Sequence, residues 1–365
     1  MKHIVCFHLL NDYSGSPIVL KMALRGLLER GNRVDLVTTE GGVLDSLLDN
    51  SNLTLHTCRY RFSPNKVVTM ARYLWVQWCT FVMAFRWMMA KNTVFYINTL
   101  LPVGPALAGR MMGKRVVYHY HENAKAKGAF YRTLAWLMQR LAHQIICVSA
   151  YQASMLESSE KITIVPNALP REFAENTRPD CEKAFDQQSI LMLSSLKEYK
   201  GTDEFIRLAT MMPEYRFILV INDEQNQIDK YIEQKKLTIS DNLSVYPRQK
   251  EVVEFYKQAS VVLNLSDKHR FIETFGMTAL EAMTAGLPVI GPTVGGIAEI
   301  VKDGENGYQI DGRETKRIAQ CIKKMLSDKK LYTQLAKGAL ETSKKYSESA
   351  LTSAVATILN DNAQA

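Results

Sequence analysis

Short apolar runs alternate with segments of helical periodicity along most of the chain. In the first half the apolar runs are 3–9, 33–38, 53–57, 93–98, 115–119, 144–148 and 161–165, and helical periodicity fills 17–30, 66–90, 103–112, 129–142 and 150–157. Nearly continuous apolar strands that alternate with helices are typical of a parallel sheet covered on both faces. The first half is therefore predicted to form one α/β domain.

The alternation stops between residues 166 and 189, a polar stretch with three prolines that we interpret as a linker. It starts again with apolar runs at 190–194, 216–221, 243–246, 261–265, 288–291 and 307–310, and helical periodicity at about 202–212, 225–236, 250–259, 276–285 and 314–326. This pattern predicts two Rossmann-like domains, at 1–168 and 169–345. The last helical segment, about 346–361, is expected to pack back on the first domain.

Length and composition agree with two globular domains. The chain has 365 residues, more than one hydrophobic core usually organises, and is 47% hydrophobic and 22% charged. Its six cysteines show no C-x-x-C pair and no metal-ligand spacing, which indicates reduced thiols. The longest uncharged apolar stretch, thirteen residues between Arg72 and Arg86, is shorter than the ~20 that span a bilayer. The N-terminal apolar run is too short for a signal peptide, so we expect a cytoplasmic protein.

Lysine and arginine outnumber aspartate and glutamate by 45 to 37, which gives a net charge of +8. Such an excess favours anionic partners, whether phosphorylated substrates, anionic lipid surfaces or nucleic acid. No zinc spacing, helix-turn-helix signal or RNP-type aromatic strand is present, so no nucleic-acid partner is expected. The loop after the first strand, 11–17, matches neither G-x-G-x-x-G nor a Walker loop, which disfavours a dehydrogenase or an ATP-binding protein.

The strongest candidate for chemistry is the run from Glu273 to Pro288, E-T-F-G-M-T-A-L-E-A-M-T-A-G-L-P. Gly276 precedes a helix that stops at Gly286, and the N-terminus of such a helix suits a phosphate. Along one helix the carboxylates of Glu273 and Glu281 would lie up to roughly 12 Å apart, too far for the ~5–9.5 Å pair of a hydrolase. That spacing suits two groups that hold opposite ends of an extended ligand. Plain surface charges are the alternative, and the apolar neighbours argue against it because an unpartnered glutamate there would be costly.

The run continues with G-G-I-A-E at 295–299 and D-G-E-N-G-Y at 303–308. Together these segments resemble the retaining glycosyltransferases of family four, which carry an E-x7-E motif. V-P-N-A at 165–168 and Lys200-Gly201 resemble two further segments of that family. The resemblance is close in the C-terminal half and loose in the N-terminal half. It implies the GT-B architecture, two Rossmann-like domains that face each other across a cleft.

The resemblance also implies roles for individual residues. Glu281 would bind the ribose hydroxyls of a nucleotide sugar, and Glu273 would contact hydroxyls of the transferred sugar. Lys200 would neutralise the diphosphate, whose negative charge grows as the glycosidic bond breaks. The sugar and diphosphate would be lined by the backbone of Thr274, Phe275, Gly276 and Met277.

One position departs from the family pattern. The family has Gly-Arg after the first strand of the second domain, where the arginine is a second diphosphate clamp, and this chain has Ser194 and Ser195 there. Lys197, Arg248 or Arg270 is expected to supply the missing charge. Family members generally need no bound divalent metal, so neither a metal nor another cofactor is expected.

The first domain offers two further candidates. Gly15, which precedes a predicted helix, resembles the family's glycine loop that touches diphosphate and acceptor; a plain tight turn is the alternative. His121, followed by Glu122, resembles the family's strand-end histidine and would contact the donor sugar, with His119 as the fallback. A metal site at this His-x-His pair has little support, because no further histidine or cysteine lies nearby. A structural histidine is the other alternative.

The aromatic segment 67–90 has two interpretations. It is either a helix buried against the first sheet or an interfacial helix, with tryptophans at headgroup depth and flanking cations against anionic lipid. In the second case the basic clusters at 110–115 and 125–132 would extend the membrane surface.

The residues and the resemblance together predict a retaining glycosyltransferase that transfers a hexose from a nucleotide-diphosphate sugar, a UDP-sugar. The expected acceptor is a glycan or lipid-linked glycan of bacterial lipopolysaccharide, O-antigen or capsule synthesis, at the inner face of the cell membrane. The UDP preference and the acceptor come from the family resemblance alone. The alternatives are a nucleotide-sugar epimerase of the same architecture, a non-enzymatic nucleic-acid-binding protein, and a sugar-binding paralogue made inactive by Ser195.

Overall fold

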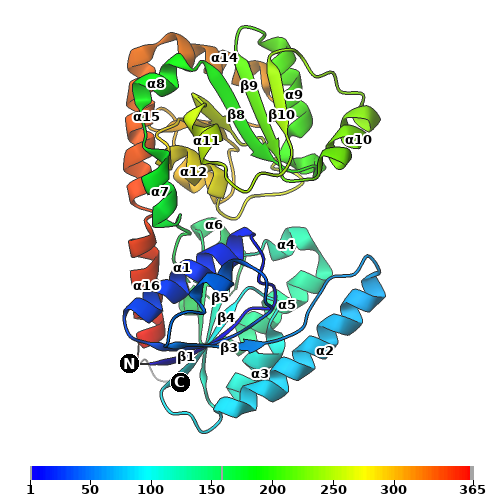
Figure 1. Cartoon of the computed structure of the whole chain (residues 1–365), viewed down its shortest axis with the longest axis vertical. Helices are drawn as coiled ribbons and strands as arrows, with labels where there is room; N and C mark the ends of the chain where they lie inside the picture. The colour runs from blue at the N-terminus through cyan, green and yellow to red at the C-terminus, as the bar shows by residue number, and fades with distance from the viewer. Residues whose placement is uncertain (1, 158, 362–365) are drawn as a thin grey trace. The chain divides into compact units, whose positions relative to one another are not determined.

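The computed structural model describes residues 2–157 and 159–361 and divides into two compact units. The first unit contains the chain up to Ala168 together with the segment from Glu348 onward, and the second runs from Leu169 to Ser347. Each unit is built around one parallel sheet with helices in the connections (Figure 1). The prediction of two parallel-sheet α/β domains is confirmed.

The first unit contains a seven-stranded sheet in the order β3-β2-β1-β4-β5-β6-β7. All neighbouring strands pair in parallel, with Val5 of β1 opposite Asp35 on one side and Phe95 on the other. The strands are β1 (His3–Phe7), β2 (Arg33–Thr38), β3 (Leu53–Thr57), β4 (Thr93–Asn98), β5 (Arg115–Tyr120), β6 (Gln144–Cys147) and β7 (Ile162–Ile164).

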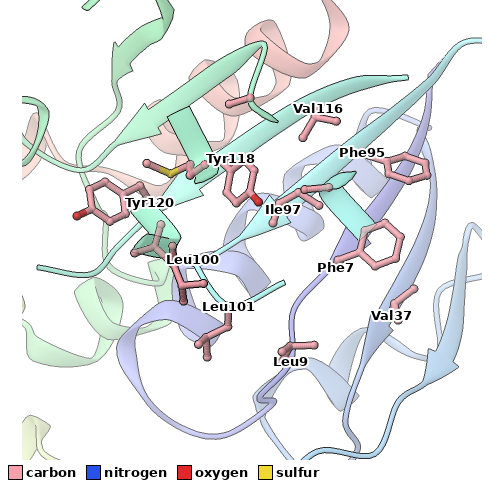
Figure 2. Close-up of a cluster of buried hydrophobic side chains, with 14 of the residues drawn as sticks. Phe7, Leu9, Val37, Phe95, Ile97, Leu100, Leu101, Val116, Tyr118 and Tyr120 are labelled. Atoms are coloured by element: carbon pink, nitrogen blue, oxygen red, sulfur yellow. The ribbon is translucent and has the colours of Figure 1, made fainter. Parts of the chain in front are cut away.

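Helices cover both faces of this sheet. They are α1 (Gly15–Glu29), α2 (Lys66–Ala84), α3 (Val103–Met111), α4 (Ala124–Lys127), α5 (Ala129–Leu141), α6 (Ala150–Ala153) and α16 (Glu348–Asn360), with 3-10 turns at Val43–Leu47, Phe85–Trp87 and Ser159–Lys161. Because side chains alternate along a strand, β1 sends Ile4 and Cys6 into the core under α1 and α16, and Val5 and Phe7 into the core under α2, α3 and α5. Figure 2 shows the second of these cores, where Phe7 lies beside Phe95.

The C-terminal helix α16 packs against α1. Arg25 of α1 forms an ion pair with Glu348 at the start of α16. Gly26 lies in the interior of α1, where glycine is normally unfavourable, because a Cβ atom there would come within 2.4 Å of the Cβ of Thr352. The glycine therefore sets how closely the two helices approach.

The second unit contains a six-stranded parallel sheet in the order β10-β9-β8-β11-β12-β13. Its strands are β8 (Ser189–Ser194), β9 (Arg216–Ile221), β10 (Leu243–Tyr246), β11 (Val261–Leu263), β12 (Val289–Gly291) and β13 (Gly307–Gln309). Its helices are α7 (Arg171–Thr177), α8 (Cys181–Asp186), α9 (Thr202–Met211), α10 (Gln225–Lys235), α11 (Val253–Lys257), α12 (Met277–Thr284), α13 (Ile297–Ile300), α14 (Thr315–Ser327) and α15 (Lys329–Lys344), with a 3-10 turn at Glu198–Lys200.

Two expectations about the connections were wrong. The stretch 166–189, expected to be a linker, contains α7 and α8, and most of it belongs to the second unit. Its polar residues cap short helices: the Asp180 carboxylate accepts a hydrogen bond from the Lys183 amide at the start of α8. The helix expected over 66–90 ends at Ala84 and continues as the 3-10 turn Phe85–Trp87.

In each sheet the direction in which successive strands are added reverses at one point in the strand order. In the first unit the chain leaves β1 toward β2 and leaves β4 toward β5, so the connections diverge between β1 and β4. In the second unit they diverge between β8 and β11. Ligands of open parallel sheets bind beyond the carboxyl ends of the strands at such a point. Each unit can therefore hold a ligand at the carboxyl ends of its strands, beside β1 and β4 in the first unit and beside β8 and β11 in the second.

The Gly26→Ala substitution should destabilise the first unit, although alanine favours a helix over glycine by about 1 kcal/mol elsewhere. The new methyl group would overlap Thr352, and overpacking of this kind costs about 1–3 kcal/mol. Chemical denaturation of the whole chain measures the change. The double variant Gly26→Ala with Thr352→Gly is the control and should recover most of the loss; a more stable single variant would contradict the packing described here.

Candidate functional site

In the second unit the loops that follow β8 and β11 meet at the point where the connections diverge. Lys200 lies in the turn after β8, and its Nζ is 2.5 Å from Oε1 of Glu273, in the loop after β11. The hydroxyl of Ser266 donates a second hydrogen bond to the same carboxylate oxygen, at 2.9 Å. Both side chains of the ion pair are partly buried. Their charges are stabilised by each other and, for Glu273, by the neutral hydroxyl of Ser266.

Glycines allow these loops to come close enough for that contact. Gly201 has φ of +74°, and a Cβ atom there would lie 2.4 Å from the carbonyl oxygen of Leu265 in the next loop. Gly296, after β12, donates its amide to the Glu273 carbonyl oxygen at 2.8 Å, and a Cβ on it would lie 2.0 Å from the Thr274 carbonyl oxygen. The G-G sequence at 295–296 is therefore required by the approach of two backbones.

Glu273 lies before the helix that carries Glu281, in agreement with the helix predicted at about 276–285. The helix α12 begins at Met277, and its N-cap is Gly276 with φ of +104°, a conformation that favours glycine. Glu273 therefore belongs to the loop that leads into the helix. The first amides of α12 point toward that loop, and the positive end of the helix favours an anion.

Glu281 lies in the second turn of α12, and its Oε2 accepts a 2.5 Å hydrogen bond from the hydroxyl of Tyr256 in α11. Burial raises the pKa of the Glu281 carboxyl to about 7, and the hydrogen bond from Tyr256 lowers it in part. The carboxyl therefore exchanges its proton near neutral pH. The Glu281 side chain is partly buried, and a carboxylate with one neutral donor has capacity to accept further hydrogen bonds, such as those that the hydroxyls of a ligand would donate.

The four residues expected to line the ligand by their backbone lie between these two glutamates in the sequence. The Phe275 side chain is buried and packs against the ring of Tyr346 at 5.7 Å, so only its backbone can face a ligand. The carbonyl group of Thr274 packs closely against Gly296, and Met277 is the first residue of α12. The backbone of this segment thus reaches the same edge as Lys200.

The basic candidates around Ser195 differ in position. Lys197 is exposed on the same loop as Lys200, 6.0 Å from the Tyr199 ring. Arg248 lies after β10 and binds Asn222 and Glu224, which follow β9, and Arg270 pairs with Glu198 at 3.0 Å. Arg248 and Arg270 thus already have acidic partners. Lys197 is the basic candidate on the same loop as Lys200.

In the first unit three polar side chains meet at the ends of β1, β4 and β5. The Asn98 amide donates to Nδ1 of His8 at 3.1 Å, and its carbonyl oxygen accepts from Nε2 of His121 at 3.0 Å. Burial lowers the pKa of His8 to about 4 and holds the pKa of His121 well below its usual range, with the neighbouring histidines adding to the effect. Both imidazoles are therefore neutral at physiological pH and act as hydrogen-bonding groups.

His119, the fallback for His121, is fully buried behind it, with the two rings 4.2 Å apart. Its Nδ1 is 2.7 Å from the hydroxyl of Tyr96, and burial lowers its pKa to about 3. The Glu122 carboxylate accepts hydrogen bonds from the backbone amides of Leu100 and His121. It therefore connects the segments that follow β4 and β5. In the described part of the chain no three histidine, cysteine, aspartate or glutamate side chains are placed to hold a metal ion.

Gly15 is the first residue of α1, directly after the loop that follows β1. It is exposed, and a Cβ atom added to it would meet nothing within 4 Å. Open space at a helix N-terminus lets a ligand approach the backbone. The structure therefore places Gly15 and His121 at the same edge of the first sheet, and Lys200, Glu273 and Glu281 in the second unit.

Two family models divide the chain between them. The model described as "Glycosyltransferase Family 4" matches residues 13–173, and "Glycosyl transferases group 1" matches residues 174–342. The chain belongs to the family-four glycosyltransferases. The division between the two models falls within α7, a few residues after the start of the second unit.

Solved structures show that this glycosyltransferase has the GT-B architecture. The crystal structure of Anabaena HepE in complex with UDP-glucose has a TM-score of 0.77 and 18% identity, and the match covers 98% of this chain and 99% of that one. WaaG, described as involved in lipopolysaccharide biosynthesis, has a TM-score of 0.70 and 19% identity over 98% of this chain and 99% of its own. At these identities the likeness concerns the fold.

A curated relative is the N-acetyl-alpha-D-glucosaminyl L-malate synthase of Bacillus anthracis, 25% identical over 215 residues, which are 51% of this chain. The matched part spans 55% of the length of that relative. Another is the D-inositol 3-phosphate glycosyltransferase of Xylanimonas cellulosilytica, 27% identical over 44% of this chain and 39% of its own length.

Several residues at the two edges of the glycosyltransferase were not found from the sequence. Tyr256, Ser266 and Asn98 each form a hydrogen bond with a candidate residue, and His8 forms one with Asn98. Tyr256 lies in a short helix 25 positions before Glu281, with no motif around it. His8 and Asn98 each directly follow or end an apolar strand, and that position was the signal that could have found them.

The Glu281→Gln substitution should remove a pH dependence of stability. The folded carboxyl has a pKa near 7 against an ordinary 4.5, so the folded state binds more protons between these values and stability falls as pH rises through them. Chemical denaturation between about pH 5 and 8 should show wild type losing up to about 3 kcal/mol relative to Glu281→Gln. Tyr256→Phe should shift that loss to higher pH. Parallel curves for wild type and Glu281→Gln would contradict the burial of the carboxyl.

Proposed function

We propose that this glycosyltransferase transfers a hexose from a UDP-sugar, with retention of anomeric configuration, to a glycan or lipid-linked glycan. The observation that carries the proposal is the arrangement at the edge of the second sheet. A cation, Lys200, is held by Glu273 next to a helix N-terminus, and the partly buried carboxyl of Glu281 lies in the second turn of the same helix.

Each part of this edge suits one part of a nucleotide sugar. A diphosphate is favoured by the positive end of α12 together with Lys200, with Lys197 as a second charge in place of the family's arginine. Ribose hydroxyls would donate to Glu281, and sugar hydroxyls to the Glu273 carboxylate. The complex of HepE with UDP-glucose, a protein of the same fold, supports UDP as the nucleotide.

No step of this reaction needs a covalent nucleophile on the enzyme. In the proposed same-face mechanism the departing diphosphate accepts the proton of the acceptor hydroxyl, so the protein orients the substrates and stabilises the leaving group. His121, Gly15 and the Asn98 network would bind the transferred sugar and the acceptor at the edge of the first sheet. His121 is neutral, which suits hydrogen bonding to a sugar rather than proton transfer.

The acceptor that we propose is a growing bacterial surface glycan, built at the inner face of the cell membrane. The whole-chain likeness to WaaG, a protein of lipopolysaccharide biosynthesis, supports this choice. The curated relatives are named for other products, an L-malate glycoside and an inositol phosphate glycoside.

Thermal-shift measurements with UDP-, GDP- and ADP-sugars should show the largest stabilisation for a UDP-sugar. Glu281→Ala should weaken UDP binding by about 10- to 100-fold, because it removes hydrogen bonds to a charged acceptor worth about 1.5–3 kcal/mol. Glu251→Ala, at an exposed glutamate of the same unit, is the matched control and should bind UDP as wild type does. Unchanged UDP affinity in Glu281→Ala would remove the ribose assignment.

Glu273→Ala should lower the transfer rate by about 100-fold or more while UDP affinity changes only a few-fold, because Glu273 is assigned to the sugar and not the nucleotide. Lys200→Met should reduce both UDP affinity and the rate. The rates are measured as UDP release from the best donor, and NMR of the product reports the anomeric configuration. An inverted product, or a sugar isomerised while still attached to UDP as an epimerase would make, would overturn the proposed reaction.

A further inference from the structure

The helix α2 has an apolar face that no part of the described chain covers. Val67, Leu74, Trp75, Trp78 and Val82 are between 51% and 77% exposed, and their spacing places them on one side of the helix. We call this set the α2 face. The opposite side of α2 buries Tyr73, Val76, Thr80 and Ala84 against the first unit.

The interpretation of 67–90 as a buried helix holds for one side of α2 only, because the α2 face is exposed. In Figure 1 α2 is the long helix, drawn in cyan and blue, at the outer side of the first unit, and it packs chiefly against α3. The turn that follows it adds the exposed Met88 and Met89. A contiguous exposed apolar surface with two tryptophans is unusual on a protein that has no partner for it.

The charges around this face have one sign. Between residues 50 and 156 the chain contains thirteen lysines and arginines and a single acidic residue, Glu122, whose side chain is buried. The remainder of the chain carries 32 basic and 36 acidic residues, so the net charge of +8 arises from this segment. The exposed cations next to α2 in sequence are Arg61, Lys66, Arg72, Arg86 and Lys91.

Not all of the segment's cations face solvent. Lys114 donates its ammonium to the Ala90 carbonyl oxygen, and Arg115 donates to the carbonyl oxygens of Ile358 and Asp361 at the end of α16. Arg110 contacts His143. Lys114 and Arg115 therefore contribute to the packing of the first unit, whereas Arg110 is exposed.

We propose that the α2 face binds the surface of an anionic phospholipid bilayer, with α2 parallel to the membrane plane. Exposed tryptophans beside aliphatic side chains suit the interface between headgroups and acyl chains, and the flanking lysines and arginines suit anionic headgroups. Among the described residues no helix is long and apolar enough to cross a bilayer, so this contact is with its surface. The contact does not depend on the proposed reaction.

Charge complementarity favours lipid over a second copy of the chain. A symmetric dimer through the α2 face would bring the same cations of both copies together, because a twofold interface pairs the same patch with itself. An anionic bilayer instead supplies the charge that the segment lacks. A membrane contact on the first unit would also keep the protein next to a lipid-linked acceptor.

Flotation of the whole chain with vesicles tests the proposal. At low salt the protein should bind vesicles of phosphatidylcholine with phosphatidylglycerol and bind vesicles of phosphatidylcholine alone much more weakly. Trp75→Ser with Trp78→Ser, and separately Lys66→Glu with Arg86→Glu and Lys91→Glu, should each reduce binding more than about tenfold. Brominated lipids should quench wild-type tryptophan fluorescence and quench the double tryptophan variant much less.

The matched control is Met211→Ser with Ile239→Ser, which removes two exposed apolar side chains from the second unit and should leave vesicle binding unchanged. UDP-sugar binding by every variant shows that it is folded and separates this proposal from the proposed reaction. Wild-type protein that fails to float with anionic vesicles overturns the proposal. So does equal flotation of the α2 variants, or a wild-type dimer in sedimentation that the tryptophan variant abolishes.

Discussion

The candidate site of the second unit depends on a contact between two backbones. The loop after β12 lies so close to the loop after β11 that Gly296 has room for no side chain and donates its amide to the Glu273 carbonyl oxygen. That contact fixes the peptide that carries the Glu273 side chain, and Gly276 then turns the chain into α12. A comparable close approach at Gly201 brings Lys200 to the same place. Packing of the loops thus requires glycine at these positions. The resulting backbone positions bring the charged side chains of Lys200 and Glu273 together.

Burial gives the titratable groups of the two edges their properties. In the first unit it lowers the pKa of three histidines that lie near one another, so the edge offers neutral hydrogen-bonding groups. In the second unit it raises the pKa of Glu281 to near neutrality, while the partly buried Glu273 is paired with Lys200. A low-dielectric environment strengthens each interaction with a polar ligand and makes each unpaired group costly. The edge of the first unit therefore suits the hydroxyl groups of a ligand, and the edge of the second unit adds Lys200 and the N-terminus of α12, which suit an anionic group.

The first unit combines two kinds of apolar surface that the sequence does not distinguish. The aromatic side chains of β1 and β4 fill a core in which Phe7 and Phe95 pack at 5.2 Å, whereas Trp75 and Trp78 of α2 are exposed. Hydrophobicity alone predicts burial for both sets. What separates them is that α2 lies at the outer side of the unit, packed chiefly on α3, so none of the described residues covers one side of α2.

The sequence by itself determined the fold class, nearly all strands and most helices, because apolar runs and helical periodicity are local and strong here. It also determined which glycines and glutamates form the motif, since spacing along the chain is sufficient to recognise it. Only the tertiary structure decided that 166–189 contains helices and which partners the charged groups have. Tyr256 and Glu281, or His8, Asn98 and His121, are brought together by strand order, and each pair is separated by tens of residues. No periodicity in the sequence encodes such contacts, because they arise only when the strands and helices of each unit assemble.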